Sequence, residues 1–429
     1  MAQSLEKARS LVGQGDFVTA SRLLNTLLAE RPDNAAALHV KAVMLNMQGQ
    51  ATEALPLIER SLQLESNDAG RWNDYGIVLA KLERSDDAIA AYERSIALAG
   101  ETVAAANAYN NLGRLHRERS PALAEQAFCR ATKLNPGFAQ AWYNLSQVLP
   151  ELGRIAEGVD AWAQATVLAP QNAPTEHHAR ALVHLGRTKE AIALYRAWLN
   201  REPGNPLVKH HLEALLKPET AVRASDAYVE TVFDGFASTF DEKLALLGYR
   251  APNLIQGALS AIHPIADARL SIADAGCGTG LCGPLVTPWA CRLVGFDLSG
   301  GMIEQARARG VYGELHKAEL AQYLAAHPVE FDVVVCADTL CYFAGLVEPL
   351  SAAFAALRSG GHMVYTVESV DTTADMHRLL PSGRYAHSHA HVMASAASAG
   401  FTVHTVTREK LREEAGRTVD GWLVTLKRP

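Results

Sequence analysis

The sequence lacks the features of secreted, disulfide-stabilised and membrane-spanning proteins. Only six of its 429 residues are cysteine, and none lies in CxxC spacing or in a pattern typical of paired disulfides. No segment approaches the ~18 consecutive apolar residues of a membrane helix. The first residues, MAQSLEKARSLVGQGDF, are charged and amphipathic, unlike a secretory signal. These absences predict a protein of a reducing compartment, which we expect to be the cytoplasm, with no membrane partner.

An excess of positive charge is also missing. The chain has 40 Lys and Arg residues against 46 Asp and Glu residues, which gives a formal net charge of −6. Binding to nucleic acid phosphates needs clustered basic residues, so a nucleic acid partner is not favoured. Hydrophobic residues make up 48% of the chain, as in folded globular proteins. The length exceeds that of one ordinary core and predicts more than one domain.

The first half of the chain repeats itself with a period of about 34 residues. Each unit has small residues at two positions, a bulky residue at a third and, in several units, a proline that ends the second helix. The corresponding residues are Ala8, Ala20, Leu24 and Pro32; Ala42, Ala54 and Ile58; Gly76, Ala88 and Tyr92; Gly113, Ala124, Phe128 and Pro136; Trp142, Leu145, Trp162, Ala165 and Pro170; and Ala179, Ala191, Tyr195 and Pro203. This pattern resembles six tetratricopeptide repeats over roughly residues 1–206, and it predicts an all-α solenoid.

A solenoid of this kind exposes a long concave surface. We expect that groove to bind a peptide or a protein. The alternative is that the repeats only support the second half of the chain or assemble it into a homo-oligomer. Four tryptophans occupy packing positions between hairpins and are expected in the core rather than on a ligand: Trp72, Trp142, Trp162 and Trp198.

The second half alternates strand and helix patterns. After Leu216 a polar stretch breaks the repeats, and amphipathic helices are predicted over 226–236 and 254–262. Alternating elements predict a doubly wound α/β sheet, with a closing antiparallel hairpin because the last two strands are joined by a short connection. The predicted strands are 270–276, 292–298, 330–338, 361–368, 401–406 and 421–427, and the predicted helices between them are 302–309, 319–326 and 346–357. We therefore expect a solenoid over 1–216, a linker with lid helices over 217–269 and an α/β core over 270–429.

A glycine cluster follows the first predicted strand. Asp274, Gly276, Gly278 and Gly280 form the sequence DAGCGTG, in which glycines let a cofactor approach the backbone and the following helix start offers N–H groups. Asp297 lies 23 residues beyond Asp274, at the end of the second strand, where an acidic side chain can accept both ribose hydroxyls. The sequence from Gly278 to Gly283 is also a GxGxxG, which on its own equally allows a dinucleotide-dependent oxidoreductase.

These motifs resemble motif I of class I S-adenosylmethionine-dependent methyltransferases. The stretches YVETVFDGFASTFDEKL, LGYRAP, GFDLSGGMI, ADTLCYF and PSGRYAHS look like those of methyltransferases that carry tetratricopeptide repeats at their N-terminus. The resemblance implies a Rossmann-like, seven-stranded mixed sheet and S-adenosylmethionine as the cofactor, with S-adenosylhomocysteine as the product. The implied cofactor-binding residues are Asp274, Gly276, Cys277, Gly278, Gly280, Asp297, Leu298, Met302, Glu319, Leu320 and Asp338.

Some of these assignments leave alternatives open. Glu319 matches the acidic residue that contacts the adenine amine, although aspartate is commoner there. Asp338 could touch the cofactor, act on the acceptor or cap the following helix. Cys277 and Cys282 are expected to pack, and Cys341 shows no activating base in the sequence.

The segment 381–391 is expected to wall the acceptor pocket. Tyr385 and His387 are the candidate acid/base or orienting residues, with Arg384 for an anionic acceptor. Tyr228 and Tyr342 complete the predicted acceptor contacts, and Phe236 and Phe240 are candidates for a lid. His387, His389 and His391 alternate along the sequence, but no further ligand cluster accompanies them, so no metal site is expected.

Three functions remain in play at this stage. The first is a methyltransferase (EC 2.1.1.-) whose repeats recruit a peptide or protein for O- or N-methylation. The second is a small-molecule methyltransferase that uses its repeats for assembly. The third is a scaffold that binds the cofactor without catalysis.

Overall fold

The computed structural model describes residues 2–217, 223–371 and 376–429. Contacts divide the chain into two compact units, Met1–Gly186 and Arg187–Pro429. Within the described ranges no helix is both long enough and apolar enough to cross a membrane. Each unit makes most of its contacts within itself, and the two are described in turn.

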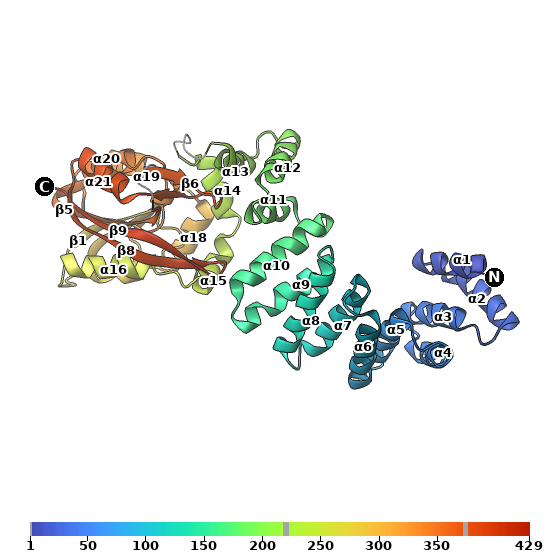
Figure 1. Ribbon diagram of the computed structural model, residues 1–429. Helices are drawn as coiled ribbons and strands as arrows, with labels where there is room; N and C mark the ends of the chain where they lie inside the picture. Colours follow the sequence, from blue (N-terminus) through green and yellow to red (C-terminus); the bar gives the residue numbers. More distant parts are fainter. Residues whose placement is uncertain (1, 218–222, 372–375) are drawn as a thin grey trace. The chain divides into compact units, whose positions relative to one another are not determined.

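The first unit is a series of antiparallel helix hairpins (Figure 1). Asp16, Asn34, Asp68 and Ser120 begin helices by accepting a backbone N–H three residues ahead. The α-helices are α1 (Ala2–Gly13), α2 (Phe17–Glu30), α3 (Ala35–Met47), α4 (Ala51–Leu64), α5 (Ala69–Lys81), α6 (Ser85–Ala99), α7 (Ala106–His116), α8 (Pro121–Leu134), α9 (Ala139–Val148), α10 (Ile155–Leu168) and α11 (Thr175–His184).

The repeat positions have the packing roles that the sequence predicts. Ala8, Ala20, Ala42 and Ala54 are completely buried where two helices meet. At Gly113 an added Cβ would lie 2.6 Å from the Phe128 ring, so only glycine allows this close approach. The helices that precede the marker prolines end two residues before them, at Glu30, Leu134, Leu168 and Arg201. The expectation of a tetratricopeptide-like solenoid is confirmed.

The described residues of the second unit form one mixed sheet of nine strands. The order β3-β2-β1-β4-β5 is parallel, and β9 pairs antiparallel with β5 and with β8. The strands are β1 (Leu270–Ala275), β2 (Ala290–Asp297), β3 (Glu314–Lys317), β4 (Phe331–Cys336), β5 (Leu357–Ser369), β6 (His377–Leu379), β7 (Tyr385–His387), β8 (Thr402–Glu414) and β9 (Arg417–Lys427). The predicted closing hairpin is therefore present, as β8 and β9.

The sheet has two more strands than the seven predicted. β5 contacts β9 along His362–Glu368 and then contacts β7 through Glu368 and Ser369. The short strands β6 and β7 form a hairpin, of which β7 lies within the segment 381–391 that is predicted to wall the acceptor pocket. Segments of three residues carry too little periodicity to be recognised as strands from sequence.

Helices cover both faces of this sheet (Figure 1). Leu324, Leu350 and Val392 pack against one face, and Ile255 and Leu259 pack against the other. The helices of the unit are α12 (Thr188–Arg201), α13 (Pro206–Leu216), α14 (Asp226–Asp234), α15 (Phe240–Leu246), α16 (Ala251–Ile262), α17 (Gly283–Val286), α18 (Gly300–Ala308), α19 (Leu320–Ala326), α20 (Val347–Ala356) and α21 (His389–Ser398).

The boundary between the units differs from the sequence boundary at residue 216. Helices α12 and α13 belong to the second unit. His210 on α13 bonds through Nε2 to the carbonyl oxygen of Gly383 at 2.8 Å, and its ring lies 4.0 Å from that of Tyr228. This contact joins α13 to the turn between β6 and β7, and the repeat pattern carried no sign of it.

Candidate active site

The glycine loop follows β1 at the carboxyl edge of the sheet. Gly276 and Gly278 both have positive φ, at 70° and 54°, a region that L side chains avoid. A Cβ on Gly276 would collide with Thr339, whereas a Cβ on Gly278 would meet no atom within 4 Å. The loop therefore packs against the turn after β4 at Gly276 and presents open space at Gly278. That open backbone is where a cofactor can approach.

Asp297 closes the loop from the end of β2. Its Oδ2 accepts the backbone N–H of Gly278 at 3.0 Å, and its Oδ1 accepts that of Ser299 at 2.9 Å. Burial raises the pKa of this carboxyl, while the two backbone hydrogen bonds lower it. The bonds fix the carboxylate beside the open face of Gly278, and its remaining lone pairs can accept hydroxyl hydrogens.

Asp274 lies beneath the loop rather than in its opening. It is 1% exposed, and its Oδ2 accepts the Tyr312 hydroxyl hydrogen at 2.6 Å. Burial raises the pKa of Asp274 to about 7, against the lowering effect of the Tyr312 hydrogen bond. The Tyr312 ring lies against Gly280 and Gly283, where an added Cβ would come within 2.9 and 2.8 Å of it. These two glycines therefore make room for a tyrosine that the sequence analysis did not select.

The helix after the loop is short. α17 has four residues and begins at Gly283, three residues after Gly280. Cys277 and Cys282 are buried beside the loop, as predicted for packing residues. Burial raises the pKa of both thiols well above the ordinary value, so neither is an activated nucleophile.

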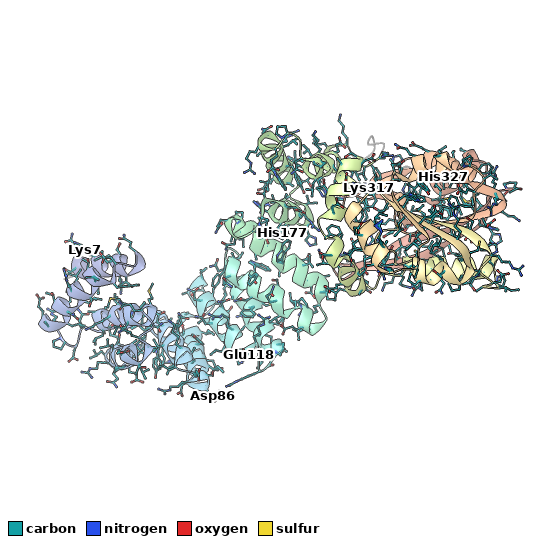
Figure 2. All side chains as sticks on the ribbon, turned by 180° about the vertical axis from the view of Figure 1, so that it is seen from behind. Lys7, Asp86, Glu118, His177, Lys317 and His327 are labelled. Carbon is teal, nitrogen blue, oxygen red and sulfur yellow. The ribbon has the colours of Figure 1, made fainter. Side chains whose placement is uncertain are left out.

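A segment of 24 residues from Arg223 to Leu246, here called the strap, bonds to three loops at this edge of the sheet. Asp241 accepts the Thr279 hydroxyl hydrogen at 2.5 Å in the glycine loop. Asp234 accepts the Gly301 N–H at 3.1 Å, at the start of α18. Glu230 forms an ion pair with Lys317, which is labelled in Figure 2. The strap therefore contacts the ends of β3, β2 and β1 in that order along the chain.

Glu319, the residue predicted to contact the adenine amine, already accepts hydrogen bonds from other residues. Glu319 is 7% exposed, caps α19 by accepting the Gln322 N–H at 2.8 Å, and bonds to Arg223 at 3.1 Å. Leu320 and Met302 are buried and Leu298 is partly exposed. All of these residues follow β2 or β3 at the sheet edge that also carries Gly278 and Asp297.

A network of charges joins the end of β4 to the end of β5. Arg412, whose side chain is 2% exposed, donates to Asp338 at 2.6 Å, to Glu414 at 2.7 Å and to Glu368. Arg384 pairs with the same two glutamates. Burial lowers the pKa of Arg412, but the three carboxylates raise it above the ordinary value overall. Both guanidinium groups are therefore charged and fully engaged with carboxylates.

The predicted acid/base pair lies away from solvent. Tyr385 and His387 are both 0% exposed. Tyr385 packs with Ala214, and burial raises its pKa to about 12. Burial lowers the pKa of His387 well below its ordinary value, so its ring is neutral. His389 is exposed, and no group of three or more metal-ligating residues occurs in the described parts of the chain.

The remaining predicted acceptor residues lie around the strap. Tyr228 is 3% exposed and is covered by His210 of α13. Tyr342 follows β4, and its ring contacts that of Phe233, with centroids 5.6 Å apart. Phe233, Phe236 and Phe240 form an aromatic cluster with centroids 5.8 to 5.9 Å apart.

A surface pocket of about 420 Å³, partly open to solvent, adjoins the charge network. Its lining includes Glu368, Arg384 and Glu414 of the network and Arg408 and Asp420 at its rim. Arg384 is predicted from the sequence, whereas Arg412, Glu368 and Glu414 are not. Glu368 and Arg412 are 44 residues apart along the chain and no short motif links their segments, so the sequence carried no signal for their meeting.

Together, the glycine loop after β1, the acidic residue after β2 and the antiparallel strand beside β5 are the arrangement of a methyltransferase domain. Residues 272–361 match the family model described as a methyltransferase domain, and residues 5–69 and 117–177 match that of the tetratricopeptide repeat. The chain is therefore a tetratricopeptide-repeat protein with a methyltransferase domain.

Individual known proteins and solved structures also resemble parts of the chain. Human methyltransferase-like protein 27 is 37% identical over 110 residues, which are 25% of this chain and 45% of that protein, so the chain spans less than half of this relative. The S-adenosylmethionine dependent methyltransferase from Mesorhizobium loti is 23% identical and covers 40% of this chain and 96% of its own, with a TM-score of 0.33. The pilF protein of Pseudomonas aeruginosa is 17% identical and covers 48% of this chain and 94% of its own, with a TM-score of 0.37.

Proposed function

We propose that this protein is an S-adenosylmethionine-dependent methyltransferase whose repeats recruit a peptide or protein for O- or N-methylation. The observation that carries the cofactor assignment is the pair formed by Gly278 and Asp297. The glycine offers open backbone, and the carboxylate beside it is held by two backbone N–H groups. This combination suits a nucleoside, whose ribose hydroxyls need an acceptor next to an unobstructed loop.

In this proposal each residue at the sheet edge has a distinct role. Asp297 accepts the ribose hydroxyls, Glu319 faces the adenine amine, and Leu298, Met302 and Leu320 line the ring. Asp274, whose pKa is raised to about 7 by burial, balances the charge of the amino-acid portion. When bound, S-adenosylmethionine supplies a methyl group on a sulfonium. The strap excludes water, so that positioning provides most of the rate enhancement.

The recruitment role is supported by a line of polar side chains on the first helices of successive repeats. His39 and Asp74 are 2.8 Å apart, Asn111 donates to Asn73 at 3.1 Å, and Asn144 donates to Asn110 at 2.8 Å. Amides and carboxylates have spare donors and acceptors for a peptide backbone. The tryptophans Trp72 and Trp142 instead bond to carbonyls six residues earlier, which suits a packing role.

Calorimetry with S-adenosylmethionine tests the cofactor assignment. Wild type should release or absorb heat, and Asp297→Ala should show none at the same concentrations. Glu304→Gln is the matched control, because Glu304 is an exposed carboxylate on α18 whose ion-pair partner among the described residues is Arg307. Equal binding by Asp297→Ala and wild type would contradict the assignment.

Removal of residues 1–186 tests recruitment. A thermal melt first establishes that the remaining unit is folded, and methylation of the native acceptor is then compared with that of the full chain. We expect the acceptor KM to rise while S-adenosylmethionine affinity is unchanged. An unchanged KM would contradict recruitment and favour the alternative in which the repeats serve assembly.

A further inference from the structure

Asp338 lies at the turn after β4. Among the described residues, one of its carboxylate oxygens accepts a hydrogen bond and the other has no donor. Its Oδ2 accepts from Arg412 at 2.6 Å, and its backbone N–H donates to the Thr366 hydroxyl at 2.9 Å. Its Oδ1 is covered and has no hydrogen-bond partner among the described residues. A buried acceptor without a donor costs roughly 1–3 kcal/mol. A ligand that supplies a hydrogen-bond donor would recover that cost.

The turn that carries Asp338 touches the cofactor loop. The neighbouring residue, Thr339, donates its hydroxyl hydrogen to the carbonyl oxygen of Gly276 at 3.2 Å. Asp338 therefore lies at the border between the loop proposed to hold the cofactor and the network at the end of β5. A methyl acceptor that met the cofactor from the side of β4 and β5 would occupy this border.

Two tyrosines, Tyr249 and Tyr342, lie within electrostatic range of the same carboxylate. The backbone of Leu247–Arg250 is bonded to β8 on both sides of Arg412, since Arg250 N–H donates to Leu411 at 2.8 Å and Glu413 N–H donates to Leu247 at 2.7 Å. Tyr249 is therefore held beside the partner of Asp338. Tyr342 follows Asp338 by four residues. Burial and then the Asp338 charge raise the pKa of Tyr249, so it is a neutral phenol.

The charge balance of the network favours a positively charged ligand. Three carboxylates, Asp338, Glu368 and Glu414, face the two guanidinium groups of Arg384 and Arg412. One negative charge is left uncompensated. An anionic acceptor would find both arginines already paired, so the earlier assignment of Arg384 to an anionic acceptor loses its support. A cation beside Asp338 and two aromatic rings would be stabilised by both.

We infer that the methyl acceptor is an amine, and that Asp338 Oδ1 holds its nitrogen between Tyr249 and Tyr342. This inference rests on the proposed methyltransferase function. The amine binds as an ammonium ion, and Asp338 Oδ1 takes one of its protons and passes it to solvent, which frees the nitrogen lone pair. The N–C bond then forms as the methyl–sulfur bond breaks, the bonding pair stays on sulfur, and the methylated nitrogen keeps the positive charge that leaves sulfur.

The test measures binding rather than turnover. Full-length protein is saturated with S-adenosylhomocysteine and titrated calorimetrically at neutral pH with n-butylammonium, n-butanol and butyrate, which differ only in the end group. We expect n-butylammonium to bind at least about tenfold more tightly than the other two probes. Asp338→Asn should abolish this preference, and Tyr249→Phe, which removes only a hydroxyl, should weaken it several-fold.

Asp332→Asn is the matched control. Asp332 lies near the start of β4, the strand that ends just before the turn of Asp338, and is also paired with an arginine, Arg358, at 2.8 Å. It should retain the wild-type preference, and all variants should keep their affinity for S-adenosylhomocysteine. Absence of any S-adenosylhomocysteine binding by wild type contradicts the proposed function. Bound S-adenosylhomocysteine with equal affinity for the three probes, or with butyrate preferred, overturns the amine inference alone. If Asp338→Asn does not fold, the Tyr249→Phe titration decides.

Discussion

The hydroxyl of Tyr312 donates a hydrogen bond to Oδ2 of Asp274 at 2.6 Å, beneath the glycine loop. The pair is buried, and burial raises the pKa of Asp274 to about 7 although the hydrogen bond lowers it. The carboxyl thus changes its charge near neutral pH. A group that is to balance a ligand ammonium must be ionised, so this relationship makes cofactor affinity depend on pH.

The first prediction concerns that dependence. S-adenosylmethionine should bind several-fold more tightly at about pH 7.5 than at about pH 6, because Asp274 is mostly protonated at the lower value. Calorimetry at the two pH values measures the change. Asp274→Asn should bind weakly with a flat profile, and Tyr312→Phe should shift the transition to higher pH. A flat wild-type profile would contradict the role of Asp274.

The second prediction separates two glycines of the loop. Gly278→Ala should fold with a cost of about 1 kcal/mol from its positive φ, yet lose most S-adenosylhomocysteine binding, because the methyl group enters the open space. Gly276→Ala should be much less stable, since its Cβ collides with Thr339. Melting curves and calorimetry together measure both effects. Full cofactor affinity in Gly278→Ala would show that the open face is not used.

The third prediction concerns the repeats. Gly113→Ala should destabilise the first unit by roughly 1–3 kcal/mol, because the new Cβ would lie 2.6 Å from the Phe128 ring. Urea unfolding measures the loss, and the added substitution Phe128→Leu should restore part of it. Gly13→Ala is the control, because a Cβ there meets nothing within 4 Å. Equal stability of Gly113→Ala and Gly13→Ala would refute the close-packing explanation.

Mild acid should weaken the second unit. Burial lowers the pKa of His387, His391 and His210, and lowers that of His362 to about 4. The unfolded chain takes up protons near pH 6.5 that the folded unit does not, so stability falls as pH drops from about 6.5 toward these lowered values. Each histidine costs up to about 1.4 kcal/mol per pH unit over that window.

Asp274 has the opposite effect on the pH dependence of stability. Its raised pKa favours the folded state at low pH, and that contribution is lost as pH rises from about 4 to about 7. Urea unfolding at about pH 5 and about pH 7 should still show a net loss in acid, because the four histidines outnumber the three carboxyls whose pKa burial raises, Asp274, Asp297 and Asp338. His387→Gln should reduce the slope, and an unchanged slope would contradict its assignment as a buried neutral ring.

The sequence predicted those features that local pattern controls. Repeat prolines end helices, small residues lie at helix crossings, and the glycines with Asp297 lie at one sheet edge, because each depends on neighbours within one unit of structure. Features that join distant segments were not predictable. Tyr312 reaches Asp274, Arg412 reaches Asp338, and α13 reaches Gly383, across 38, 74 and 173 residues. No periodicity records such pairings, and the burial of Tyr385 and His387 depends on the same long-range packing.

The attachment of α13 to the β6–β7 turn also has a practical consequence for dissecting the protein. A fragment that begins at residue 217 would lack His210. Tyr228 would then lose its ring contact and the Gly383 carbonyl its imidazole partner. A fragment that begins at Arg187 keeps that contact. Exchange of the repeat region between related proteins, in the laboratory or during evolution, should therefore succeed when the junction lies at the turn before α12. It should fail when the junction lies where the repeat pattern of the sequence ends.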